Sequence, residues 1–139
     1  MSTVKSFEEL TIWKEAREFT NRIYTLTKRF PKEELYGLTS QIRRASVSIM
    51  SNIAEGFNRR STKEFISFLI IARASTFEVQ NDLYIALDLS YINKEDFQVA
   101  YNHAQKIAMS INKLITYLKS QIKTYTKTVK INEPIHQYL

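Results

Sequence analysis

Apolar side chains recur along most of the chain at alternating steps of three and four residues, the spacing of one face of an α-helix. The four series lie within about residues 7–30, 36–57, 62–89 and 94–125. Only two glycines and two prolines interrupt the 139 residues, too few for the many turns of a β-rich domain. The connections are short, so consecutive helices should lie antiparallel. The pattern predicts an all-α fold, an antiparallel up-and-down four-helix bundle.

Polar residues mark where three of these helices should begin. Ser61 with Glu64 is a capping-box pattern in front of the third helix, and Ser6 with Glu9 repeats that pattern in front of the first. Asn93 is a favourable N-cap for the fourth helix, because its side chain can accept a hydrogen bond from a free backbone N–H. These signals set the predicted helix starts.

Other sequence features indicate where the domain ends and in which cellular compartment the protein is expected. Gly56 suits the end of the second helix, because glycine tolerates positive φ. We expect one bundle domain over residues 1–125 and a flexible tail over residues 126–139. No apolar stretch is long enough to span a bilayer, and the first residues lack the apolar run of a signal peptide. The sequence therefore predicts a soluble, cytoplasmic protein without a membrane partner.

Residues that carry enzymatic or metal chemistry are scarce. The chain has no cysteine and two histidines. A bundle di-metal site requires Glu-x-x-His pairs on its helices, but His103 does not follow a glutamate by three residues, and His136, which does follow Glu133, lies in the predicted tail. We expect His103 to be a helix-surface residue, Glu78 and Asp82 to be solvated, and Glu55 to cap a helix or pair with an arginine. The sequence predicts no catalytic residues, no metal site and no cofactor, and hence a protein that is not an enzyme.

Charge is distributed unevenly along the chain, whose net charge is +6. Residues 36–77 carry six basic and two acidic side chains, residues 78–96 carry one and five, and residues 97–139 carry six and one. In an up-and-down bundle the end of the second helix, the start of the third and the end of the fourth meet at one pole. The cations expected there are Arg59, Arg60, Lys63, Lys119, Lys123 and Lys127. This basic pole is the predicted nucleic-acid-binding surface.

Alternatives remain for several of these residues. The lysines at 119, 123 and 127 share a helix face, which is either a phosphate-contacting surface or a solvated face beyond the core. Tyr117 and Tyr125 lie nearby and can stack on bases, although Tyr125 also fits the core series. Arg43 and Arg44 lie nearer the opposite pole, where they either pair with acids or join a subunit interface.

The start of the third helix is apolar around almost its whole circumference, over residues 65–71. A peripheral helix of a monomeric bundle needs only one apolar stripe, and a helix apolar all round is buried all round. We therefore expect Ile66, Ile70 and Ile71 to face outward and to form a homo-oligomer interface. The competing interpretation is that long lysine and arginine side chains cover this surface within a monomer.

The run YGLTSQIRRASVSIMSNIAEGFNRRSTKE, residues 36–64, closely resembles bacterial four helix bundle proteins, also called 23S ribosomal RNA intervening-sequence proteins. The resemblance extends over about residues 7–120 and includes the Trp13-x-x-Ala16 opening and the Phe30-Pro31 turn. It implies a four-helix bundle, often assembled as a homopentamer. The fold is also similar to the accessory variability protein of diversity-generating retroelements, which engages RNA and a reverse transcriptase.

Two functions follow as hypotheses. The first is a non-catalytic homo-oligomer that binds RNA through its basic surfaces. The second is a protein-binding scaffold or adaptor without a nucleic-acid role, with a partner such as a reverse transcriptase by distant analogy. The chain departs from the resembled pattern at Met50, where family members usually carry proline, so its second helix should be straighter.

Overall fold

A computed structural model describes residues 4–129 of the chain, and the side chains of residues 4–123. The elements are α1 (Thr11–Thr27), α2 (Leu38–Phe57), α3 (Thr62–Asp88) and α4 (Lys94–Val129), with 3-10 turns at Phe7–Glu9 and Lys32–Glu34. The described residues contain no strand, which confirms the predicted all-α class. None of the described helices is long and apolar enough to cross a membrane.

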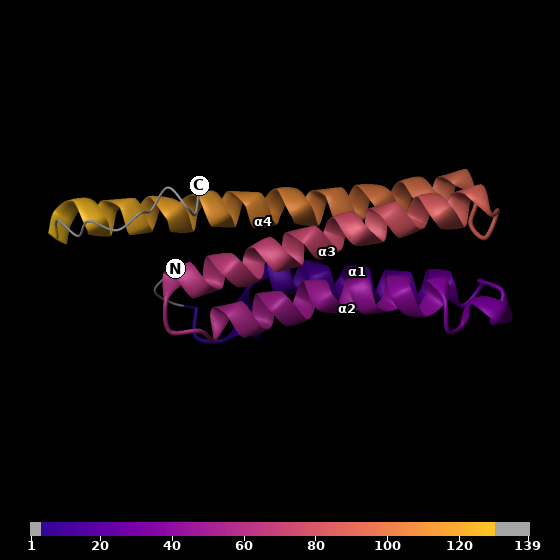
Figure 1. The fold of residues 1–139 in the computed structure, drawn as a ribbon, viewed down its shortest axis with the longest axis horizontal. Coiled ribbons are helices and arrows are strands. Elements are labelled where there is room, and N and C mark those ends of the chain that lie inside the picture. Colours follow the sequence, from indigo (N-terminus) through magenta and orange to yellow (C-terminus); the bar gives the residue numbers. More distant parts are fainter. Residues whose placement is uncertain (1–3, 130–139) are drawn as a thin grey trace.

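The four helices run side by side along the long axis of the molecule (Figure 1). The α1–α2 and α3–α4 connections lie at one end, and the α2–α3 connection lies at the other, where α4 extends beyond its neighbours (Figure 1). α2 packs against α1 and α3, and α4 packs against α3 and α1, so the helices close into a ring around one core. The predicted up-and-down four-helix bundle is therefore confirmed.

The core consists of the predicted apolar series. The largest side chains with no exposed surface include Phe19 from α1, Ile49 from α2, Leu83 from α3 and Ile111 from α4. Burying each of these contributes roughly 1.5–3 kcal/mol. The core holds the helices at fixed rotations about their axes, and those rotations decide which polar side chains reach the surface.

Helix ends agree with the sequence signals at two of three positions. Ser61 Oγ accepts a hydrogen bond from the Glu64 backbone N–H at 3.1 Å, and Asn93 Oδ1 accepts one from the Asp96 N–H at 2.8 Å. The predicted cap at Ser6 is wrong, because this segment forms a 3-10 turn and the Ser6 side chain makes no capping hydrogen bond. Its predicted partner Glu9 accepts instead from the Lys5 N–H.

Two predicted helix boundaries also differ from the structure. The first helix was expected over 7–30, but α1 ends at Thr27, and Arg29 and Phe30 continue in turn hydrogen bonds. The fourth helix continues through Val129, four residues into the predicted tail of 126–139. The rest of that tail lies outside the described residues.

Gly56 does not act as a positive-φ helix end, so that prediction is wrong. It lies inside α2, and no described glycine has positive φ. A Cβ on Gly56 would lie 2.6 Å from Phe68 Cβ and 3.0 Å from Phe65 Cδ1. Glycine is needed here because α3 crosses α2 too closely for any side chain. The same two helices also approach closely at Ser48 of α2 and Ser75 of α3, whose hydroxyls lie 2.9 Å apart.

Asp82 is fully buried, which corrects the prediction of a solvated carboxylate. The bundle turns this face of α3 toward α2, where Gln41 Nε2 donates to Asp82 Oδ1 at 2.8 Å. Burial raises the pKa of Asp82, and hydrogen bonds from Asn81 and Gln41 oppose that rise in part. Glu78, one turn earlier, is exposed as expected. Asp82 therefore links α2 to α3 and is not part of an exposed acidic pair.

Candidate nucleic-acid interface

Two hydrogen bonds fix how α3 and α4 align. Gln80 Nε2 donates to Gln105 Oε1 at 2.9 Å, and Arg73 Nη1 donates to Asn112 Oδ1 at 2.7 Å. From the first pair to the second, the residue number falls by seven on α3 and rises by seven on α4. This equal and opposite change is expected for two antiparallel helices, because both have the same rise per residue. Continuing by ten residues places Ile122 level with Lys63. The α4 lysines therefore lie alongside the start of α3.

The structure thus brings five of the six predicted cations to one end of the bundle, the end where α2 and α3 join. Arg59, Arg60 and Lys123 are exposed, whereas Lys63 and Lys119 are half-buried. The side chain of Lys127, and that of Tyr125, lie outside the described residues. We call the set Arg59, Arg60, Lys63, Lys119, Lys123 and Lys127 the basic pole.

Arg59 is held by two contacts within the basic pole. Its Nη2 donates to Glu55 Oε1 at 2.7 Å, and its guanidinium lies 4.7 Å from the centre of the Phe68 ring. The prediction that Glu55 pairs with an arginine is confirmed. Because Arg59 already has a carboxylate partner, Arg60 and Lys123 are better placed to contact phosphates.

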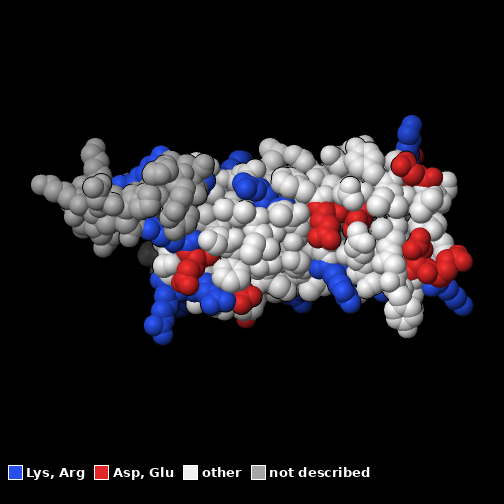
Figure 2. Space-filling view, in the orientation of Figure 1, with Lys and Arg blue, Asp and Glu red and all other residues white. Residues whose placement is uncertain are grey.

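The opposite end of the bundle carries acidic groups. Figure 2 shows several Asp and Glu side chains, with Lys or Arg beside them, at the end where α3 and α4 join, and most of the Lys and Arg in this view toward the other end. Arg29 pairs with Asp96 at 2.8 Å, and Tyr91 Oη donates to Glu34 Oε2 at 2.7 Å. The hydrogen bond to Glu34 raises the pKa of Tyr91. The acids of this end are offset in part by Lys28, Arg29, Lys32 and Lys94, which are exposed beside them.

The outward face of α3 is apolar, but one predicted residue does not belong to it. Ile66 has no exposed surface, so its assignment to an outward patch is wrong. It lies two helical turns before Arg73, whose side chain reaches Asn112, and so on the side of α3 that faces α4. Ile70 and Ile71 are 38% and 49% exposed, as expected, and Phe77 further along α3 is 49% exposed. These three residues form an exposed apolar face, which we call the α3 face.

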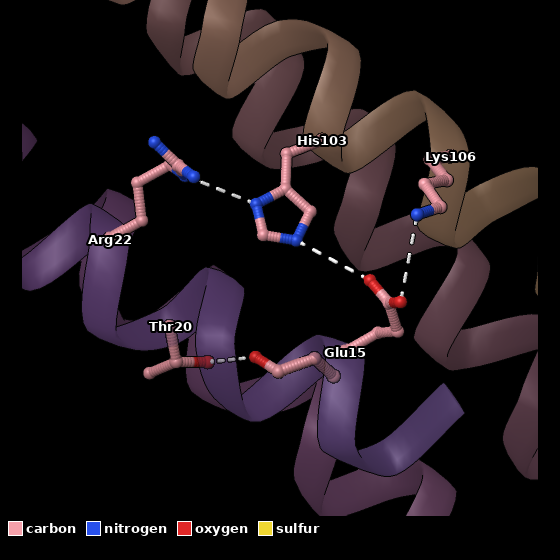
Figure 3. Close-up of polar contacts among 6 residues, drawn as sticks. Glu15, Thr20, Arg22, His103 and Lys106 are labelled. Carbon is pink, nitrogen blue, oxygen red and sulfur yellow. Dashed lines mark hydrogen bonds and ion pairs between the residues drawn. The ribbon is translucent and has the colours of Figure 1, made fainter. Parts of the chain in front are cut away.

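A second polar cluster, missed by the sequence analysis, joins α1 to α4 (Figure 3). The His103 side chain is only 13% exposed, which corrects its prediction as a surface residue. Arg22 Nε donates to His103 Nδ1 at 3.1 Å, while His103 Nε2 lies 3.7 Å from Glu15 Oε2. The other Glu15 oxygen lies 3.7 Å from Lys106 Nζ. The cluster escapes a sequence search because its residues come from helices 80 or more positions apart.

This cluster contains metal-ligand types but is arranged for another purpose. One ligand atom from each of Glu15, Glu18 and His103 lies within 4.8 Å of the others. However, Arg22 donates to Nδ1, which leaves the proton of neutral His103 on Nε2, the nitrogen that faces Glu15. A metal at Nε2 would need that proton moved to Nδ1, against the Arg22 donor, and would lie near a second cation, Lys106. The geometry supports a hydrogen-bonded link between helices.

The His103 cluster makes a prediction about pH. Burial lowers the pKa of His103 from 6.5, the adjacent Arg22 and Lys106 lower it further, and Glu15 and Glu18 oppose them. The folded state therefore favours the neutral ring, so its stabilisation is complete above about pH 6.5 and is lost as pH falls below that value. We expect His103→Gln to flatten this loss in denaturant unfolding measured at several pH values.

The control for this experiment is His136→Gln at the chain's other histidine. That variant should keep the wild-type pH dependence. A His103→Gln protein whose stability falls with acid as steeply as the wild type would contradict the assignment.

Comparison with known proteins shows which family this chain resembles. Residues 8–113 match the model described as 23S rRNA-intervening sequence protein. The chain belongs to that family. The family's fold recurs in a protein of unknown function from the S23 ribosomal protein family of Bacteroides thetaiotaomicron, with a TM-score of 0.70 and 26% identity over 75% of this chain and 97% of that chain. No curated protein matches the chain.

Membership of the 23S rRNA-intervening sequence protein family confirms the resemblance found in residues 36–64. It agrees with the bundle fold, which the solved relative shares. Because that relative has no known function, the activity has to be argued from the surfaces described above.

Proposed function

We propose that this 23S rRNA-intervening sequence protein is a non-catalytic, cytoplasmic homo-oligomer that binds RNA through its basic pole. The observation that carries the proposal is the convergence of cations from the α2–α3 connection, α3 and α4 at one end of the bundle, away from the acidic end. Lysine and arginine side chains that neutralise phosphates release counterions, and this release dominates nucleic-acid affinity. Clustering on one end lets several cations meet the same RNA strand.

The test is binding of a fluorescein-labelled single-stranded oligouridine, followed by anisotropy across a potassium chloride series. The logarithm of the affinity should fall linearly with the logarithm of salt concentration, with a slope of about −0.7 for each phosphate contacted. Binding that does not weaken with salt, or no binding even at low salt, would refute the proposal.

A second candidate function, a protein-binding scaffold, draws support from the α3 face. Monomeric proteins rarely expose large contiguous apolar patches, and exposed ones usually mark interaction sites. In the favoured proposal the α3 face is covered by other copies of the chain, and five copies is the number that the family resemblance implies. Under the scaffold alternative, a different protein covers this face and RNA does not bind.

Self-association through the α3 face leads to a specific prediction. The double variant Ile70→Asp, Ile71→Asp should dissociate the oligomer, because each aspartate would bury an unpaired charge, which costs several kcal/mol. Size-exclusion chromatography with light scattering should give a multiple of 16.3 kDa for the wild type and 16.3 kDa for the variant.

The matched control is Val99→Asp, which alters an apolar residue of α4 that is 50% exposed and leaves the α3 face intact. It should keep the wild-type mass. A wild-type mass of one chain at micromolar concentration would rule out self-association.

A further inference from the structure

A groove with both aromatic and cationic walls lies along α2, toward the acidic end of the bundle and separate from the basic pole. Its volume is about 680 Å³, within the range of ligand sites. The residues that line it include Tyr24, Tyr36, Arg43 and Arg44. We call it the Tyr36 groove.

Arg43 is held in place on one side of this groove. Its Nε donates to Thr27 Oγ1 at 2.8 Å, and its guanidinium lies 4.6 Å from the centre of the Tyr24 ring. Thr27 Oγ1 in turn donates to the Ile23 carbonyl at 2.7 Å. Neither alternative raised for Arg43 from sequence, an acidic partner or a subunit contact, is needed to explain this geometry. A guanidinium fixed through Nε and ring stacking keeps its terminal N–H groups available for an anion.

Arg44 and Tyr36 complete the groove. Arg44 is exposed, and among the described residues it has no ion pair or side-chain hydrogen bond. Tyr36 is 94% exposed, far more than the other large apolar or aromatic side chains of the described chain. Since an isolated aromatic ring in water gains nothing from that position, its exposure favours a role in contact with a planar partner.

We infer that the Tyr36 groove binds one unstacked nucleotide of a single-stranded RNA, with the base on the Tyr36 ring and its phosphate on Arg43 and Arg44. Base stacking on an aromatic ring combined with arginine contacts to the backbone is how single strands are held. A duplex keeps its bases stacked inside and offers none to Tyr36. The inference rests on the proposed function and adds that the RNA is single-stranded where it meets this groove.

The surroundings of Arg44 supply a charge test. Glu78 lines an adjoining hollow together with Tyr36, Gln41 and Arg44. Its carboxylate would repel a phosphate held by Arg44. Glu78→Gln should therefore raise the affinity for single-stranded RNA by about twofold to fivefold, since one screened charge is removed.

The main experiment compares two probes, a fluorescein-labelled oligouridine and a blunt RNA duplex, by anisotropy at one low salt concentration. Tyr36→Ala should lower the affinity for oligouridine by about tenfold, the scale of one lost stacking contact, and should leave duplex binding unchanged. Tyr36→Phe, which keeps the ring, should bind like the wild type. Arg44→Gln should lower oligouridine affinity and reduce its salt slope by about 0.7.

The outcomes separate this inference from the proposed function. If the wild type binds neither probe, the proposed function fails. If the wild type binds but Tyr36→Ala binds oligouridine normally, or loses both probes equally, only the groove inference fails. Variants that bind RNA normally but change the oligomer mass would assign the groove to a subunit interface and overturn the inference as well.

Discussion

Changing Lys119, Lys123 and Lys127 together to glutamine is expected to lower the affinity for single-stranded RNA by about 10- to 100-fold at low salt and to flatten the salt slope by about two. Lys123 lies level with the start of α3, and Lys119 precedes it by one helical turn on the same face. Because each lysine contact releases about 0.7 counterion from a single strand, three lost contacts account for the change in slope.

The matched control for the triple variant is Lys28, Lys32 and Lys94 changed to glutamine. These three lysines are exposed and lie where α1 meets α2 and α3 meets α4, the end opposite the basic pole. The control loses the same net charge, so a general effect of protein charge would affect both variants equally. Equal loss in the two variants would show that the basic pole has no special role.

The second large effect is expected at Gly56, where replacement by alanine should destabilise the bundle by about 2 kcal/mol. The added Cβ would lie 2.6 Å from Phe68 Cβ, an atom attached directly to the α3 backbone, so the two helices must separate. Alanine's higher helix propensity, worth about 1 kcal/mol, offsets only part of this cost. We expect the melting temperature to fall by about 6–8 °C.

Ser51→Ala is the control for Gly56→Ala, because Ser51 is an exposed residue of the same helix. It should leave the melting temperature unchanged or raise it slightly, as helix propensity alone predicts. A Gly56→Ala protein that melts at or above the wild-type temperature would contradict the close α2–α3 contact.

The fold was predictable from sequence because apolar spacing alone determines which face of each helix is buried. Phe19, Ile49, Leu83 and Ile111 all belong to the predicted series, and all are fully buried. The capping residues Ser61 and Asn93 were also predictable, since their hydrogen bonds reach only three residues along the chain.

The errors occur where the outcome depends on a neighbouring helix. Gly56 was interpreted through its own backbone freedom, whereas its role is set by Phe68 on α3. Asp82 was expected in solvent, but the rotation of α3 turns it toward Gln41. Ile66 was expected at the surface, but it is fully buried on the flank of α3 from which Arg73 reaches Asn112 of α4. The local sequence pattern predicts which face of each helix points to the core. Whether the residues beside that face are also buried depends on how the neighbouring helices pack against it.

The basic pole was predictable in outline, because topology follows from short connections and topology brings distant cations together. Its detail was not predictable, since pairing of Arg59 with Glu55 and the half-burial of Lys63 depend on side-chain packing at the start of α3. The Tyr36 groove was missed because its walls combine α1, the turn before α2, and α2 itself.

The most direct test of RNA binding at the basic pole is ultraviolet crosslinking of the full chain to oligouridine, followed by mass spectrometry of the crosslinked peptides. The account predicts crosslinks on peptides that contain residues 57–65 and 117–127, lost when the salt concentration is raised. Crosslinks confined to other peptides, or insensitive to salt, would contradict it.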